Sequence, residues 1–486
     1  MREIYRYISN NYHTFAMESR GMYSINYEIL AKEICNIVSD FFKTHSSLLS
    51  EIPELIFINT VERKSKYIVE YDEHYILLDL HQVMEYVWGS QVASFIDGDI
   101  LSVISGATGG DKENIEIGMS LFLYSSDQNI LKARICNCFN LADLCFSKGY
   151  VDAAIKNLCS VITMREDIND NNLADMIFSE QLLYEAKIIG GFIYLHELTH
   201  HFFEQNKKHL SGIGDIKRLI NLIRLRYESG VLSKEWRKYA CKYSSDNYIV
   251  NLEISDLFCK MKINTKYPRL FEQLENHALS WKNMNFESDD WELFSEELIC
   301  DIIALNAIIS IEKANHYIIS YIVRALLIQE TFSLQDNLLM CLTGRQKEIN
   351  LKNIKRVQLI FAALVVDYQE CENHQGWNSI ISYVNYGKEK FDDLLIDICN
   401  SVEVIHENFY LVAVQDLFKS LLSEDVLHKH INCAYFLEAG SKKFVFTDDY
   451  SGKKNTNKKR MTDIDGILLQ KELIEEYEKF IQYVFE

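Results

Sequence analysis

The scarcity of proline constrains the fold of this chain more than any other feature of its sequence. Only two prolines, Pro53 and Pro268, occur in 486 residues, together with 19 glycines. Because proline breaks helix interiors, such scarcity is typical of long helices. The chain is also 48% hydrophobic, so it can bury a substantial core. We therefore predict a predominantly α fold, of class α+β, built from two or three structural units.

Two stretches depart from helical spacing and predict β-structure. Residues 55–61, "LIFINTV", and 66–80, "KYIVEYDEHYILLDL", are rich in β-branched and aromatic residues, and "YDEHY" is typical of a turn between two strands. We expect a small antiparallel sheet within about residues 54–82. A second short hairpin is predicted in "YFLEAGSKKFVFTDDY" at 435–450. The stretch "SGATGGDKEN" at 105–114 is predicted to be a loop, and it lacks the Gly-Lys-Ser/Thr ending of a phosphate-binding loop.

The net charge of the chain argues against two classes of partner. Seventy acidic against fifty basic side chains give a formal charge of −20, which repels nucleic-acid backbones and anionic lipid. The first residues, "MREIYRYISNNYHTF", lack the apolar segment of a signal peptide, and the longest apolar runs fall short of a bilayer span. The twelve cysteines show no C-x-x-C spacing and are expected to be reduced. These features predict a cytoplasmic protein that acts on a protein or peptide substrate, has no nucleic-acid or membrane partner, and is a candidate for control by a regulatory protein.

The stretch "YLHELTHHFFEQ" at 194–205 carries the motif H-E-x-x-H within a predicted helix of about residues 179–206. Residues four apart lie on one helical face, so His196 and His200 can ligate the same metal ion. Glu197 points about 100° away from His196, so it can accept a proton from water at the metal without being a ligand. Zn²⁺ is the ion expected at such a pair, because it lowers the pKa of its water towards about 7. The apolar flanks predict a buried site that needs a cation.

A third ligand is predicted in "SEELICDIIALNA", on a second helix of about residues 290–312. Glu297 and Asp301 are four apart on an otherwise apolar face, where two carboxylates repel each other unless something positive lies beside them. We therefore expect Glu297 to ligate the metal and Asp301 to accept the second N–H of a liganding histidine. Glu296 and Glu292 are the competing ligands. Glu296 lies nearer the exposed edge of the helix, which favours Glu297 but leaves the choice between them open.

Three other side chains lie near these motifs in the sequence. His201 points about 100° away from His200 and is expected not to ligate. His316 and Tyr317 follow the second helix and are candidate donors to the oxyanion of a tetrahedral intermediate.

The sequence "HELTH", followed by the E-x-x-C-D pattern from Glu297 to Asp301, resembles the gluzincin branch of the zinc metallopeptidases. In that family the first glutamate of the second motif is the third zinc ligand, and the aspartate supports a histidine. The resemblance therefore implies these two roles for Glu297 and Asp301. It covers about residues 190–310 of the chain.

The resemblance also implies an arrangement of the whole chain. Residues 1–312 correspond to a zincin-like metallopeptidase region, in which an edge strand within Tyr67–Leu80 aligns the substrate peptide by strand addition. Residues 313–486 form an α-helical region for substrate recognition or regulation. The C-D pair makes the chain similar, in addition, to the Lit-type phage-exclusion peptidases of bacteria, which implies a role in antiviral defence.

Together these features predict a zinc-dependent endopeptidase that cleaves an intracellular protein with metal-activated water. Two alternatives stay open. The first is a helical interaction protein with a structural or vestigial zinc site, which a closed site of four protein ligands would reveal. The second is a metal-dependent hydrolase of a non-peptide amide or ester, because the motif specifies the activated water and not the carbonyl that it attacks.

Overall fold

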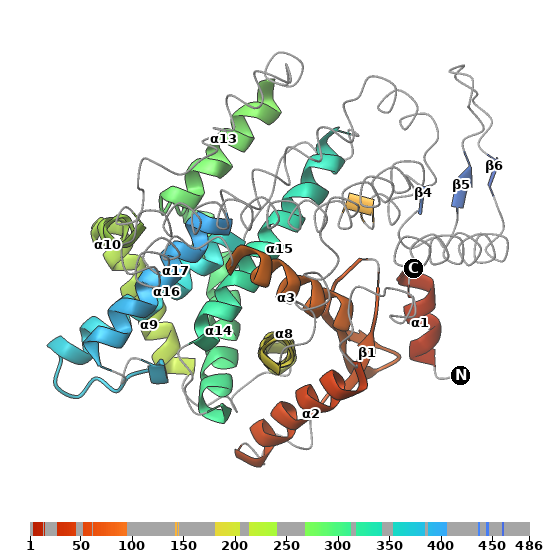
Figure 1. The fold of residues 1–486 in the computed structure, drawn as a ribbon, viewed down its shortest axis with the longest axis horizontal. Helices are drawn as coiled ribbons and strands as arrows, with labels where there is room; N and C mark the ends of the chain where they lie inside the picture. Colours follow the sequence, from red (N-terminus) through yellow and green to blue (C-terminus); the bar gives the residue numbers. More distant parts are fainter. Residues whose placement is uncertain are drawn as a thin grey trace, which may run out of the picture.

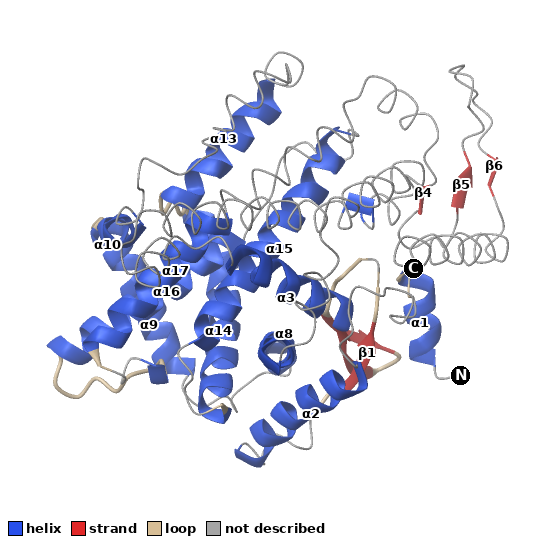
Figure 2. Ribbon diagram, in the orientation of Figure 1, coloured by secondary structure: helices blue, strands red, loops and turns tan. Residues whose placement is uncertain are grey.

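A computed structural model gives the fold, and the residues it describes are mostly helical (Figure 1), as the helices drawn in blue in Figure 2 show. The described residues are 3–12, 14, 27–44, 52–60, 62–94, 141–142, 144, 180–204, 213–240, 268–312, 317–342, 353–383, 387–405, 436–437, 444–446 and 459–460. The helices are α1 Glu3–Asn11, α2 Tyr27–Thr44, α3 Leu80–Ser94, α8 Glu180–Glu204, α9 Ile213–Glu228, α10 Val231–Ala240, α13 Pro268–Lys282, α14 Ser288–Ile311, α15 Tyr317–Leu342, α16 Asn353–Asn373 and α17 Lys388–Ile405. The strands are β1 Glu54–Ile58, β2 Lys66–Glu70, β3 Glu73–Asp79, β4 Phe436–Leu437, β5 Phe444–Phe446 and β6 Lys459–Arg460. The predicted predominantly α class is confirmed.

Helix α8, which carries the H-E-x-x-H motif, lies at the centre of the described structure. Figure 1 shows it end-on between α14, α2, α3 and the sheet, and it contacts α15 as well. Its sequence is apolar on nearly every side, as a helix buried all round requires. Gly190 lets α2 approach closely, because a Cβ there would lie 2.5 Å from the Cδ1 atom of Ile34. The site is thus built on a helix that packing holds from several directions.

The sheet predicted near residues 54–82 is present, but it is mixed and not antiparallel. Its strand order is β1-β3-β2, with β2 and β3 antiparallel and β1 and β3 parallel. The predicted turn joins β2 to β3 at Tyr71 and Asp72, whose φ values are 56° and 62°. The prediction was wrong about β1, which runs parallel to β3. Residues 75–79 of β3 are buried in a row, as is typical of a central strand with a neighbour on each edge. Strand β2 is left as an edge strand that contacts α8.

Asp79, the last residue of β3, fixes the start of α3 and the connection between β1 and β2. Its buried carboxylate accepts the N–H of His81 at 3.0 Å, which is the role of a helix N-cap. It also accepts the N–H of Lys64 at 3.1 Å and the N–H and hydroxyl of Thr60. The segment that precedes β2 is therefore held against α3.

One hydrophobic core extends across the boundary that was expected near residue 312. Helix α14 packs along α8, and α15 packs against α8, α3, α16 and α17. Helix α16 packs in turn against α14, α15 and α9. The helices that follow residue 313 are thus part of the same packed body as the motif helices, and two of them reach the site described below.

The remaining sequence predictions have different outcomes. The hairpin predicted at 435–450 is present as β4 and β5, which pair antiparallel, and β6 adds a third strand to it. The glycine-rich stretch at 105–114 lies outside the described residues. Of the described helices, α15 alone is long and apolar enough to cross a membrane, but 78% of its apolar window is buried inside the molecule. Burial in the core accounts for that apolar sequence.

Candidate metal centre

Helix α8 places the two motif histidines on one face, in agreement with their spacing of four residues. The Nε2 atoms of His196 and His200 lie 3.1 Å apart. His196 is buried, with 7% of its surface exposed, whereas His200 is partly exposed. Both rings therefore border the same small space, His196 from the side of the core and His200 from nearer the surface.

Helix α14 supplies Glu297 as the third group. Its Oε2 lies 3.4 Å from Nε2 of His196, and its Oε1 lies 3.6 Å from Nε2 of His200. One ligand atom from each of the three residues can be chosen so that all lie within 4.8 Å of one another. In a tetrahedral zinc site with bonds of about 2.0–2.1 Å, neighbouring ligand atoms are about 3.3–3.4 Å apart. The observed spacings of 3.1 to 3.6 Å fit an ion bound between the three residues.

A carboxylate lies within hydrogen-bonding distance of the Nδ1 atom of each histidine. Nδ1 of His196 lies 2.9 Å from Asp301 Oδ1, and Nδ1 of His200 lies 3.2 Å from Glu296 Oε1. Because a carboxylate only accepts, the Nδ1 atoms carry the proton in neutral rings, and the two Nε2 lone pairs then face each other. These lone pairs and the Glu297 carboxylate repel one another unless a cation lies among them. The arrangement can hold a proton or a metal ion, with Glu297 as the third candidate ligand and Glu296 beside Nδ1 of His200.

Arg356 was not predicted from the sequence, yet it lies at the back of this group. From α16 its Nη2 and Nε atoms donate to the two carboxylate oxygens of Asp301 at 2.5 and 3.0 Å. Burial favours a neutral Asp301, but Arg356 and His196 outweigh it and hold the pKa of Asp301 well below its usual range. Burial and Arg356 oppose a charge on His196, yet hydrogen bonds to Asp301 and Glu297 prevail and raise the pKa of His196 to about 9. The only signal in the sequence was a basic residue near the start of the apolar stretch "NIKRVQLIFAALVV".

Glu197 lies beside the candidate ligand group of His196, His200 and Glu297 without belonging to it. The backbone N–H of Tyr67, on edge strand β2, donates to Glu197 Oε2 at 2.8 Å. This bond fixes one carboxylate oxygen and leaves the other as the candidate proton acceptor. The Tyr67 hydroxyl lies 2.6 Å from Nδ1 of His74 and 3.2 Å from Nδ1 of His201, so His201 faces the sheet. A backbone donor carries no signal in the sequence, so only the fold reveals this contact.

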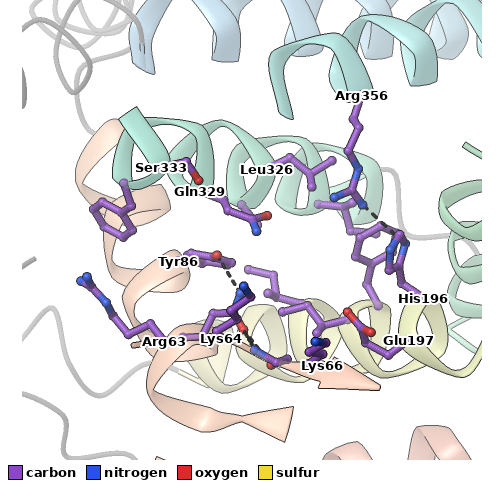
Figure 3. A pocket seen from close by; sticks show the side chains of 18 of the residues that line it. Arg63, Lys64, Lys66, Tyr86, His196, Glu197, Leu326, Gln329, Ser333 and Arg356 are labelled. Atoms are coloured by element: carbon purple, nitrogen blue, oxygen red, sulfur yellow. Dashed lines mark hydrogen bonds between the residues drawn. The ribbon is translucent and has the colours of Figure 1, made fainter. Parts of the chain in front are cut away.

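A pocket of about 550 Å³ opens beside His196, His200 and Glu297. Its walls come from residues 62–66, α3, α8 and α15, and both His200 and Glu297 line it. Figure 3 shows the pocket as a space between α15 on one side and the segment that leads into β2 on the other, with Arg356 close to His196. The ligand group is thus accessible from a pocket that is large enough for part of a substrate.

The structure does not bring Tyr317 to the ligand group. Tyr317 is half exposed and stacks on Tyr321, which makes an edge contact with Tyr184 of α8. Tyr184 precedes His196 by twelve residues, which is about 18 Å along a helix. His316 lies outside the described residues. An oxyanion role for Tyr317 therefore has no support in the geometry.

Comparisons with protein-family models, with curated proteins and with solved structures give no match to this chain. The interpretation of the site therefore depends on its own geometry, above all on the meeting of two histidines and one glutamate at a pocket wall.

Proposed function

We propose that this protein is a zinc-dependent endopeptidase with a zincin-like catalytic core. The proposal is carried by the convergence of His196, His200 and Glu297, within 4.8 Å of one another, at the wall of a pocket. Two histidines and one carboxylate form the zinc-ligand set of known peptidases, in which the fourth position stays open for water and substrate. The pocket gives this fourth position access to a substrate.

The chain's own groups take separate roles in this proposal. His196, His200 and Glu297 hold the ion. Zinc bound there supplies a Lewis acid that polarises a carbonyl and acidifies water. Glu197 accepts the proton of the attacking water with the oxygen that the Tyr67 N–H does not bind, and later returns a proton to the leaving amine.

Two observations favour this function over the alternatives. A structural zinc site is closed by four protein ligands, whereas three of the described residues, His196, His200 and Glu297, lie close enough together to share an ion. A hydrolase of small amides or esters has no need of a sheet edge, whereas β2 presents one directly beside Glu197. An extended peptide can pair with such an edge, which favours a peptide substrate.

The substitution Glu197→Gln tests the proposed mechanism, because it removes the proton acceptor and spares the ligands. Zinc-loaded wild type is expected to cleave members of a proteome-derived peptide library, as read by mass spectrometry. The variant should lose about 10²- to 10⁴-fold in rate while its zinc content stays unchanged. Glu389→Gln, at an exposed glutamate of α17, is the matched control. Full activity in Glu197→Gln, or a wild type that cleaves nothing when loaded with zinc, would contradict the proposal.

A further inference from the structure

Two lysines line the pocket without a salt bridge to any of the described residues. The pocket also holds two arginines, but Arg356 is bound to Asp301 and Arg63 is bound to a buried glutamate of α3 at 2.6 Å. Lys64 and Lys66, by contrast, are exposed. The chain carries a formal charge of −20, yet these two cations of the pocket have no acidic partner in the part of the chain that the structure describes. They are available to a bound molecule.

The fold holds both lysines close to the proposed proton acceptor. Lys66 directly precedes Tyr67, whose N–H binds Glu197. At most about 10 Å of backbone separates Lys64 from Tyr67, because an extended chain rises about 3.3 Å per residue. Ser65, between the two lysines, donates both its N–H and its hydroxyl to a glutamine of α3 at 2.7 Å. The backbone that carries the two ammonium groups is therefore fixed.

The acidic side chains of the pocket do not cancel the positive charge of Lys64 and Lys66. In the proposed mechanism Glu197 accepts the proton of the attacking water, and Glu297 is a ligand of the metal ion. Glu62 precedes Arg63, whose guanidinium lies 5.2 Å from the ring centroid of an α15 phenylalanine. Asp336 lies one turn beyond that phenylalanine on α15. Figure 3 shows Arg63 at the end of the pocket away from the metal ligands, with Lys66 close to Glu197. With the proposed zinc bound, its two positive charges offset Glu197 and Glu297, so Lys64 and Lys66 leave this end of the pocket with a net positive charge.

We propose that the substrate is an acidic protein segment, in which an Asp or Glu side chain within about three residues of the scissile bond binds Lys64 and Lys66. The inference rests on the proposed endopeptidase function and names its substrate class. A peptide that lies along the β2 edge advances about 3.3 Å per residue, so a carboxylate two or three residues from the cut comes level with these ammonium groups. The two lysines thereby determine specificity and take no part in the chemistry.

A binding measurement tests this inference separately from hydrolysis. Two fluorescein-labelled decapeptides that differ only in Glu or Gln at two central positions are titrated into the zinc-loaded Glu197→Gln protein. The Glu peptide should bind on the order of tenfold more tightly at low ionic strength. Adding Lys64→Glu and Lys66→Glu should abolish or reverse that preference. Lys390→Glu, at an exposed lysine of α17, should leave it unchanged. Equal binding of the two peptides, or binding of neither, would overturn the inference.

Cleavage gives the second readout. Sites that the wild type cuts in the peptide library should be enriched in Asp and Glu within three positions of the scissile bond, and the double lysine variant should shift that enrichment to Lys and Arg. With the Glu and Gln peptides as substrates, the double variant should raise KM for the Glu peptide and leave kcat unchanged. Cleavage without acidic enrichment, or an equal fall in kcat for both peptides, overturns the inference and leaves the peptidase standing. A wild type that cuts nothing contradicts the proposed function, while the binding titration still decides the inference.

Discussion

The carboxylate of Asp301 interacts with both His196 and Arg356. Asp301 is fully buried and is shared between the ring of His196 and the guanidinium of Arg356. Removing one partner of a buried ion pair leaves the other charge unpaired, which costs more free energy than the intact pair contributes. Asp301 therefore orients the ring of His196, a proposed metal ligand, and through the same carboxylate it connects α16 to α14.

We expect Asp301→Asn to weaken zinc binding about 10- to 100-fold, because His196 loses the carboxylate that orients its ring. The same change should lower the free energy of unfolding by about 3–5 kcal/mol, since Arg356 stays buried and charged. Chelator competition and urea unfolding measure the two effects. Adding Arg356→Met should restore much of the stability but not the zinc affinity, and Asp393→Asn, at an exposed position of α17, is the control. Equal stability of the single and double variants would contradict this account.

At the scale of elements, the position of α8 depends on its contact with α2. We expect Gly190→Leu to lower the free energy of unfolding by about 1–3 kcal/mol or more, because its side chain would overlap Ile34, whose Cδ1 and Cγ1 atoms lie 2.5 and 3.1 Å from an ideal Cβ. Gly214→Ala is the matched control, since no atom lies within 4 Å of its Cβ position in α9. That change should stabilise the protein by about 0.5–1 kcal/mol. Urea unfolding that shows both substitutions to be neutral would argue against the close packing of α2 on α8.

Asp79, which holds the connection from β1 to β2, is expected to make the stability of the fold depend on pH. Burial raises the pKa of Asp79 to about 6, against the opposing effects of His81 and of hydrogen bonds from Thr60 and Lys64. Because the folded-state pKa is above the ordinary value of 3.8, Asp79 contributes stability that is fully present below about pH 4 and is lost as the pH rises through about 6. We therefore expect the stability difference between wild type and Asp79→Asn to be larger at about pH 4.5 than at about pH 7.5, by up to about 3 kcal/mol. Urea unfolding at the two pH values measures it, and a difference that grows with pH would be the opposite of this prediction.

At the scale of the whole molecule, the sequence predicts contacts between residues close together in the chain. It does not predict contacts that depend on how distant strands and helices pack. The four-residue spacings of His196 with His200 and of Glu297 with Asp301 are helical, and both pairs lie on one face as expected. The sheet is different, because the parallel pairing of β1 with β3 joins strands that are not consecutive in the chain. Arg356 lies 55 residues after Asp301, and an apolar helix such as α16 does not reveal which face meets α14.

The zinc content of the purified protein tests the existence of the metal centre most directly. After dialysis against trace zinc, elemental analysis should find about one ion per chain in wild type, in Glu197→Gln and in Glu296→Gln. His196→Ala, His200→Ala and Glu297→Ala should each lose most of it, with circular dichroism confirming that the helices persist. A wild type without zinc, or zinc that survives the loss of these three side chains, would contradict the account.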